Sequence, residues 1–309
     1  MERHVVHHIE HVRGVHLAAA VHIASAPTGL IIPPSGILII YPVLAGCSVV
    51  GMIMSGYIPG LMWALACMVV AYVIAKKNHY PTAGKVPASV FFKYFVDAIP
   101  SLLLIVIIVG GVMSGIFTAT ESAAVAVAYT LFLSIVVYRS IKIKDLPKIL
   151  LDACETTAVI MFLIAGSNVM SFVMSFTGLP SAIGNALISV SSNKYVILLI
   201  INLVLLVVGC FMDITPAVLI FTPIFLPVVQ SFGMDPIHFG IMMVMNLGIG
   251  NITPPVGSAL FSGCSVADMD MEDMIKPILP FYAAIFVALM LVAYVPWFSM
   301  ALPTLFGAV

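Results

Sequence analysis

The sequence has 309 residues, of which 62% are hydrophobic and 8% charged, and its formal net charge is −1. A soluble domain carries about a quarter charged residues, so this composition and a mean hydropathy of +1.20 exclude an ordinary soluble domain and indicate an integral membrane protein. The near-neutral charge, without a basic patch interleaved with aromatic residues, excludes nucleic-acid binding.

The chain begins with an atypical histidine-rich segment, residues 1–17, which stands apart from the apolar sequence that follows. His4, His7, His8 and His11 have the i, i+3, i+4, i+7 spacing that would place them in one stripe on a helix, where they could bind Zn²⁺ or Ni²⁺. A histidine-rich tract is only a compositional hint of metal binding. We therefore expect no transition-metal site and interpret the segment as a non-native start.

Continuous apolar runs predict an all-α polytopic membrane protein rather than a barrel, whose strands would alternate. Six runs approach or reach the ~20 residues that a helix needs to cross the ~30 Å hydrocarbon core. These are Pro59–Ala75, Ile99–Phe117, Ser122–Tyr138, Thr157–Ser175, Val196–Met212 and Ile278–Ser299. Four shorter runs are predicted to be half-helices or re-entrant segments: Leu17–Ile32, Gly36–Ala45, Ala217–Val229 and Phe239–Ile252.

Basic residues are concentrated in two loops, which hold eight of the twelve lysines and arginines. The positive-inside rule places both loops in the cytoplasm. The loops carry Lys76, Lys77, Lys85 and Lys93, and Arg139, Lys142, Lys144 and Lys148. The apolar stretch between them should therefore run out and back as a hairpin that turns near Gly115–Ser122, whereas Lys194 and Lys276 are isolated and indicate little about their side.

An internal repeat is the most informative feature of the sequence. The pattern G-x-x-x-P-P-x-G occurs at Gly29–Gly36 and again at Gly250–Gly257, 221 positions later, and GCSV recurs at Gly46 and Gly263. Broken apolar segments at matching positions are typical of secondary transporters built from inverted repeats, with broken helices and re-entrant hairpins. We expect a remnant of a first repeat at about 18–75 and a second repeat at about 95–300. A simple kink in a packed bundle is the alternative for either motif alone.

Polar residues near these breaks are the candidate ligands of an ion or an organic anion. Sodium is a hard cation that should prefer neutral oxygens, and carbonyls freed by the prolines could add to them. The candidates in the first copy are Ser25, Thr28, Gly29, Pro33, Pro34 and Ser35, and those in the second copy are Asn246, Gly250, Asn251, Thr253, Pro254, Pro255 and Gly257.

Further ionisable and polar residues have two interpretations each. Asp213, with Thr215, could line the ion or substrate path, because a carboxylate in the membrane is costly unless it faces a cavity; alternatively it caps the following helix. Glu121, beside Thr118 and Thr120, is either a helix-start residue or part of an ion path.

His238 follows Asp235-Pro236, which is typical of a helix N-cap and its first residue, so we predict an interfacial histidine in the first turn. No nucleophile–base or metal-ligand spacing accompanies Asp213 and His238, so no enzyme activity and no cofactor is expected. The five cysteines are predicted to be small buried hydrophobic residues.

The chain contains, in this order, the segments "SAPTGLIIPPSGILIIY", "GIFTATESAAVAVAY", "GCFMDITPAVLIFTPIFLPVV" and "MDPIHFGIMMVMNLGIGNITPPVG". With them, residues 18–309 resemble the large membrane subunit of tripartite ATP-independent periplasmic (TRAP) transporters. The resemblance implies a sodium-coupled permease of the bacterial inner membrane. It also implies a small membrane subunit, a periplasmic binding protein and an organic anion such as a C4-dicarboxylate or a sugar acid.

The chain departs from the family pattern in two places. The family has TPTE where this chain has Thr118-Ala119-Thr120-Glu121. The upstream part of the second repeat has no partner in the first, which implies on inverted-repeat logic that roughly 70–130 residues of a complete permease are missing. The alternative function is accordingly a truncated remnant that inserts in the membrane and at most binds the small subunit.

Overall fold

The computed structural model describes residues 2–78, 80, 87–191 and 193–308. Lys85 of the first cationic loop is not among these residues. The predicted histidine stripe lies in a described helix, but the positions of its side chains are not described. All regular secondary structure in the described part of the chain is helical, as predicted. The chain divides into two compact units, Met1–Tyr80 with Ser167–Val309, and Pro81–Gly166.

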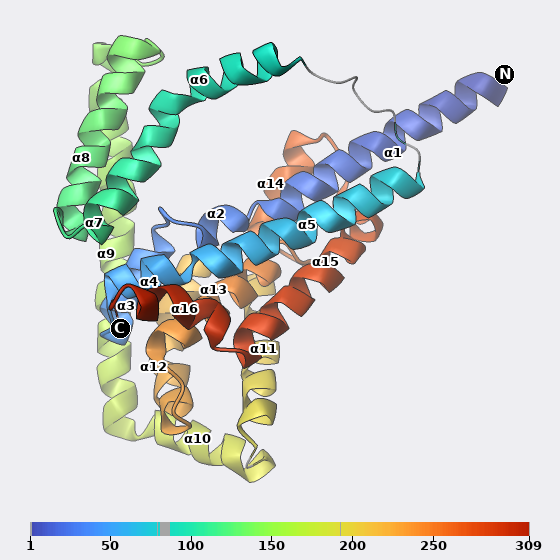
Figure 1. Cartoon of the computed structure of the whole chain (residues 1–309). Coiled ribbons are helices and arrows are strands. Elements are labelled where there is room, and N and C mark those ends of the chain that lie inside the picture. Colours follow the sequence, from blue (N-terminus) through green and yellow to red (C-terminus); the bar gives the residue numbers. More distant parts are fainter. Residues whose placement is uncertain (1, 79, 81–86, 192, 309) are drawn as a thin grey trace. The chain divides into compact units, whose positions relative to one another are not determined.

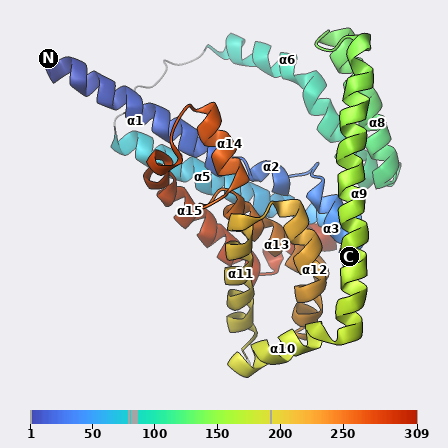
Figure 2. The ribbon, with the colours of Figure 1, turned by 180° about the vertical axis from the view of Figure 1, so that it is seen from behind.

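The first unit contains most of the helices (Figure 1). Three of them, α1 (Glu2–Ser25), α5 (Tyr57–Lys77) and α15 (Met271–Tyr294), pack against one another and run side by side (Figures 1 and 2). The others are α2 (Thr28–Ile31), α3 (Ile37–Ala45), α4 (Val49–Ser55), α10 (Leu179–Val190), α11 (Lys194–Phe211), α12 (Ile214–Ser231), α13 (Pro236–Asn251), α14 (Ser258–Val266) and α16 (Trp297–Leu305).

Helix α13 forms the core of this unit, because every residue from Ile237 to Asn251 is buried. It is apolar on nearly all faces and packs against α11, α12, α15 and α4. Lys194 and Asp235, at the starts of α11 and α13, line one pocket, and Gly209 and Gly250 meet near their ends. Helices α11 and α13 are therefore parallel, and Figure 2 shows α12 beside α11 with α10 across their far ends.

The second unit is a helical hairpin followed by the first part of α9 (Leu146–Thr177). Its first arm is α6 (Ala88–Ile105), continued by a π-helical turn at Val106–Gly110 and by α7 (Gly111–Met113). Its second arm is α8 (Ala119–Phe132), with another π-helical turn at Leu133–Val137, and a short 3₁₀ helix covers Ile143–Asp145. The chain reverses between Met113 and Ala119, so the predicted turn is confirmed. Hydroxyl groups join the arms, since Ser122 donates to the Ile108 carbonyl at 2.9 Å.

Eight helical segments in the described residues are long and apolar enough to cross a membrane, two more than predicted. Gly14–Ile31 and Ile214–Ser231 qualify, so the segments predicted as half-helices or re-entrant at Leu17–Ile32 and Ala217–Val229 lie in stretches longer than expected, the first of them interrupted between α1 and α2. Pro223 and Pro227 lie inside α12 without ending it. The short helices predicted for Gly36–Ala45 and Phe239–Ile252 are present as α3 and α13.

The last predicted span, Ile278–Ser299, was wrong at both ends. Helix α15 begins at Met271, because Pro277 and Pro280 are accommodated inside it. It ends at Tyr294, and Val295 is extended with φ −118° and ψ 96°. A residue that precedes a proline is disfavoured in the helical region, so Pro296 explains this end.

Helices α11 and α13 cross at two glycines. A Cβ added at Gly250 would lie 2.5 Å from the backbone of Gly209, which no real side chain tolerates without movement. By contrast, a Cβ at Gly29, the matching glycine of the first motif copy, would meet no atom within 4 Å. The crossing therefore needs glycine at 250, whereas the first copy does not need it at 29 for packing.

We expect Gly250→Ala to lower the free energy of unfolding by about 1–3 kcal/mol, the usual cost of overpacking a tight contact. The measurement is thermal unfolding of the purified chain in detergent. Gly29→Ala is the matched control and should leave the transition unchanged or raise it, because alanine favours helix. Equal losses in the two variants would contradict a specific crossing at Gly250.

Candidate functional site

The second proline motif ends α13 and separates it from α14. Pro254 and Pro255 have no N–H to continue the helix, and the peptide bond between them is cis. Gly257 has φ +36°, and a Cβ there would lie 2.7 Å from the Thr253 carbonyl oxygen. The motif thus imposes a turn that opens the backbone over residues 252–257.

Hydrogen bonds from neighbouring helices hold this turn. The backbone N–H groups of Val256 and Gly257 donate to the Cys210 carbonyl at 3.2 and 3.3 Å. This carbonyl lies in the last turn of α11, where carbonyls lack intrahelical partners. The Tyr282 hydroxyl donates to the Ile252 carbonyl. The break is therefore fixed to α11 and α15 and is not a loose loop.

Three side-chain oxygens meet beside the turn. The Ser258 Oγ lies 2.6 Å from Asn251 Oδ1 and 3.3 Å from Asp213 Oδ1. The Ser258 hydroxyl has one hydrogen to give, whereas the amide oxygen and the carboxylate both accept. Asn251 is buried and Asp213 is exposed. One hydroxyl hydrogen is thus shared between two acceptor oxygens, and an excess of acceptor oxygens suits a hard cation such as sodium.

Four helix ends converge on the same cluster. Helices α11 and α13 finish next to it, and α12 and α14 begin there, at Ile214 and Ser258. Helix C-termini carry partial negative charge and favour a cation, whereas N-termini favour an anion. Asp213 occupies the N-cap position of α12, but its side chain makes no capping hydrogen bond. Its carboxylate is therefore turned toward Ser258 instead of the helix it precedes.

A buried amide pair joins α11 to α13, about two and a half turns before the end of α11 and about one and a half turns before the end of α13. Asn246 Nδ2 donates to Asn202 Oδ1 at 2.8 Å and to the Asn202 carbonyl at 2.9 Å. Asn202 in turn donates to the Leu198 carbonyl at 2.8 Å. Asn246 Oδ1 is buried and has no partner among the described residues. An unsatisfied acceptor in a fully buried position is a possible ligand for a cation or a water molecule.

The first proline motif forms the equivalent break, with a second cis bond between Pro33 and Pro34. Gly36 precedes α3 as Gly257 precedes α14, and both helices have nine residues. The Ser25 and Ser35 hydroxyls donate to nearby carbonyls of His22 and Leu30, at 3.1 and 2.6 Å.

The first break packs against α13 on a different face from Asn246. Thr28 Oγ1 in this break is buried without a partner in the described part of the chain. A Cβ at Gly248 would lie 3.2 Å from Pro27, whereas Asn246 faces Asn202 on α11. The structure therefore brings the first break next to α13 and leaves it out of the cluster around Asp213.

The remaining candidate residues make local contacts within or next to their own helices. Thr253 Oγ1 donates to the Ile249 carbonyl at 2.6 Å, and Thr215 is half-buried in the first turn of α12. In the second unit, Thr118 and Glu121 form a capping box at the start of α8, with Glu121 Oε2 2.8 Å from the Thr118 backbone nitrogen. Thr120 is exposed. This geometry supports the helix-start interpretation of Glu121.

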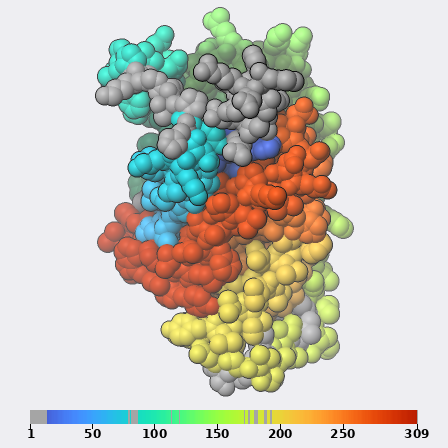
Figure 3. Space-filling view, turned by 90° about the vertical axis from the view of Figure 1, so that its right-hand side faces the viewer, coloured from blue at the N-terminus to red at the C-terminus, as the bar shows by residue number. Residues whose placement is uncertain are grey.

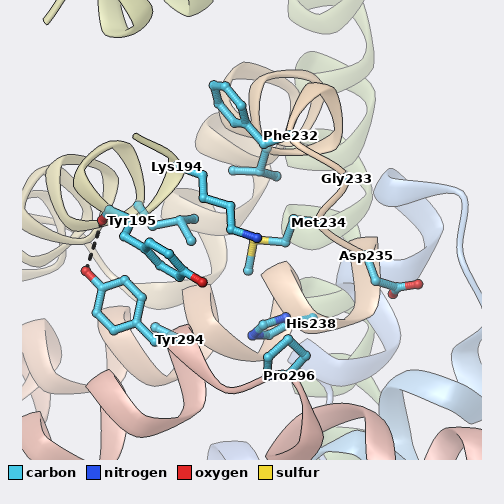
Figure 4. A pocket seen from close by; sticks show the side chains of 12 residues that line it. Lys194, Tyr195, Phe232, Gly233, Met234, Asp235, His238, Tyr294 and Pro296 are labelled. Carbon is cyan, nitrogen blue, oxygen red and sulfur yellow. Dashed lines mark hydrogen bonds between the residues drawn. The ribbon is translucent and has the colours of Figure 1, made fainter. Parts of the chain in front are cut away.

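A pocket of about 230 Å³ lies at the opposite end of α11 and α13 from the break (Figure 4). His238 lies in the first turn of α13, as predicted, lines this pocket and is 4% exposed. Asp235 caps α13 as predicted, accepting from the Ile237 backbone nitrogen at 2.8 Å. His238 Nε2 lies 2.9 Å from the Val292 carbonyl, and burial lowers the pKa of this imidazole. His238 is thus a packed residue that ties α13 to α15.

The cysteine prediction was correct for Cys67, Cys210 and Cys264, which are buried. It was wrong for Cys154, which is exposed on α9, and Cys47 is intermediate. Sequence reasoning also missed two polar residues of the site, Asn202 and Ser258. A single asparagine inside the apolar run that follows Lys194 and Tyr195 in α11 was an available signal for Asn202. The sequence signal for Ser258 was weaker: it is the first residue after the proline motif.

Comparisons with known proteins agree on one family. The sequence model of the family described as the DctM component of tripartite ATP-independent periplasmic transporters matches residues 14–298. The chain is 50% identical to the uncharacterized protein YgiK of Salmonella typhimurium, over 94% of this chain and 67% of that protein. It is 39% identical to the sialic acid TRAP transporter large permease SiaM of Vibrio cholerae, over 92% and 66% of the two chains.

The chain is also 38% identical to the C4-dicarboxylate TRAP transporter large permease DctM of Pseudomonas aeruginosa, over 90% of this chain and 65% of that protein. The chain therefore spans about two thirds of the length of these curated relatives: the matched part is 67%, 66% and 65% of the three proteins. Substrates differ among the relatives, since the names of two of them specify sialic acid and C4-dicarboxylates.

We expect Asn202→Leu to lower the free energy of unfolding by about 1–3 kcal/mol, because it leaves the buried Asn246 amide without its partner. The double variant Asn202→Leu/Asn246→Leu should lose less than the sum of the single variants, since it removes both partners together. Thermal unfolding in detergent measures this cycle. Exposed Asn185→Leu, on α10, is the control and should change stability little. Strict additivity would contradict a coupled pair.

Proposed function

The chain belongs to the DctM family of TRAP transporter large permeases and is a multi-pass protein of the bacterial inner membrane, and on this premise we propose that it carries an organic anion into the cell together with sodium. The family is one of transporter permeases and not of enzymes. The proposal extends this membership to a coupling ion, a substrate class and partners.

The observation that carries the proposal is the oxygen cluster of Asp213, Asn251 and Ser258 at four converging helix ends. The C-termini of α11 and α13 favour a cation, and the N-termini of α12 and α14 favour an anion. A sodium ion and a carboxylate could therefore bind close together, each at the helix ends of suitable charge. This arrangement offers a physical basis for coupling, because a cation bound at Asp213 attracts an anion nearby.

In this proposal each break supplies its own sodium ligands, because the first break lies outside the cluster around Asp213. In the second break they are the side chains of Asp213, Thr215, Asn246, Asn251 and Thr253, with backbone at Gly250, Pro254, Pro255 and Gly257. In the first break they are Ser25, Thr28 and Ser35, with backbone at Gly29, Pro33 and Pro34. The buried acceptors Asn246 Oδ1 and Thr28 Oγ1, which have no partner in the described residues, support the inclusion of both breaks. We also propose that Thr118, Thr120 and Glu121 line an ion path in the second unit, in addition to the capping role of Thr118 and Glu121.

We further propose that the two breaks are re-entrant tips of inverted repeats, at about 18–75 and 95–300. Helices α3 and α14 support this, because each has nine residues and each follows the final glycine of the same motif. Helix α1, before the first break, packs against α14, after the second. Helix α3, after the first break, packs against α12 and α13, before the second. Such reciprocal packing is what two related repeats would produce.

The substrate class follows from the relatives. Sialic acid and C4-dicarboxylates are both carboxylic acids, so we propose an organic anion such as a dicarboxylate or a sugar acid. The name of the family implies a tripartite complex with a periplasmic component. We therefore propose a small membrane subunit and a periplasmic substrate-binding protein as partners. A remnant that inserts without transporting is the alternative, and uptake by this chain would contradict it.

We expect Ser258→Ala to raise the sodium concentration that gives half-maximal uptake by about tenfold, which corresponds to the loss of one hydrogen bond to a charged group. Asp213→Asn should have a larger effect, because it removes the charge itself. The assay is sodium-driven uptake of labelled organic acids into proteoliposomes that contain this chain, the small subunit and the binding protein.

Ser231→Ala is the matched control, because Ser231 donates only to the Val228 carbonyl of its own helix. Its sodium dependence should equal that of the unmodified chain. A full-length relative of known substrate, reconstituted in the same way, verifies the assay. Uptake that is independent of sodium, or equal effects of Ser258→Ala and Ser231→Ala, would contradict the proposed ion site.

A further inference from the structure

A second cavity, of about 360 Å³, opens where α1, α5 and α15 meet. It involves none of the residues of the oxygen cluster. Figure 3 shows the face on which α5 (cyan) and α15 (orange) come together, with a small part of α1 (blue) visible between them. The polar lining residues of the cavity are His16, Lys77, Asn78, Tyr80 and Lys276.

The polar lining of this cavity is cationic. Lys77 ends α5 and Lys276 lies near the start of α15, and neither forms an ion pair with another described residue. Asn78 and Tyr80 add hydrogen-bond donors, and the described lining includes no acidic residue. Glu272 and Asp273 lie one turn before Lys276 on α15 but do not line the cavity. Two ammonium groups without an acidic partner among the described residues, Lys77 from α5 and Lys276 from α15, therefore line the cavity.

Apolar side chains are also exposed on two of the helices that form the cavity. On α5, Val69, Tyr72 and Val73 are exposed, and on α15 Ile275 and Leu279 are exposed. Both helices are candidate membrane spans. In a bilayer these side chains would face acyl chains, because a helix exposes apolar residues where it meets lipid. The cationic cavity thus lies on helices that expose apolar side chains, which together we call the apolar lane.

We propose that this cavity binds the headgroup of an anionic phospholipid, with its phosphate between Lys77 and Lys276 and its acyl chains on the apolar lane. Basic pockets between membrane-spanning helices on the cytoplasmic side bind anionic headgroups. The positive-inside rule assigns the Lys76–Lys77 end of α5 to that side, and the structure places the isolated Lys276 beside it. The site does not depend on the proposed transport activity.

The test is a lipid titration of the purified full chain in detergent, followed by native mass spectrometry. Phosphatidylglycerol should bind more tightly than phosphatidylcholine with the same acyl chains. Lys77→Gln/Lys276→Gln should weaken binding of phosphatidylglycerol by about tenfold or more, since one lysine near an anionic lipid surface contributes about 1 kcal/mol. Lys77→Arg/Lys276→Arg should retain it, because the positive charge is kept.

Lys76→Gln is the matched control, because it removes the same charge from the adjacent residue. The Lys76 ammonium lies 5.9 Å from the centre of the Tyr72 ring and does not line the cavity. Equal affinity for the two lipids, or a loss in Lys76→Gln as large as in the double variant, would overturn the proposal. Displacement of the lipid by millimolar inorganic phosphate would also overturn it, since free phosphate would then be the ligand.

Discussion

The structure of the first unit depends on one constraint, which is that backbone N–H and C=O groups inside an apolar medium need partners. A helix satisfies them internally, and a break does not. At the second break, the N–H groups of Val256 and Gly257 find the Cys210 carbonyl, and the Ile252 carbonyl receives the Tyr282 hydroxyl. At the first break, the Ser35 hydroxyl reaches the Leu30 carbonyl. Each proline pair is therefore tolerated because neighbouring groups accept the bonds that the helix gives up.

Those bonds require close approach, and glycines on α13 provide it on several faces. Gly250 meets Gly209 of α11, Gly248 lies against Pro27, and Gly240 lies under the ring of Tyr41, where an added Cβ would be 2.3 Å from a ring atom. A helix buried on all sides cannot carry large side chains everywhere without pushing its neighbours apart. The spacing of these glycines therefore lets α11 and the first break sit against α13 together, and it fixes the position of the second break relative to both.

The sequence predicted the breaks, the short helices α3 and α13, and the turn of the second unit, because prolines, glycines and loss of hydropathy mark them directly. It failed where a proline lies inside a helix. Pro223 and Pro227 in α12 and Pro277 in α15 do not end their helices, and single-sequence reasoning cannot see the neighbours that compensate. Asn202 and Ser258 were missed for a related reason, since their importance comes from contacts with residues 44 and 45 positions away in the chain. Hydropathy carries no information about such contacts.

The two breaks share a backbone motif but differ in side-chain chemistry. In the first, the Ser25 and Ser35 hydroxyl hydrogens are used by nearby carbonyls, and no carboxylate accompanies them among the hydrogen-bonded residues of that segment in the described structure. In the second, Asp213 and Asn251 compete for the one hydrogen of Ser258, so acceptor oxygen is left over. A cation is attracted to excess acceptors and to fixed negative charge. A duplicated proline motif therefore repeats the opening of the backbone, whereas the charge that would hold sodium is concentrated at the second copy.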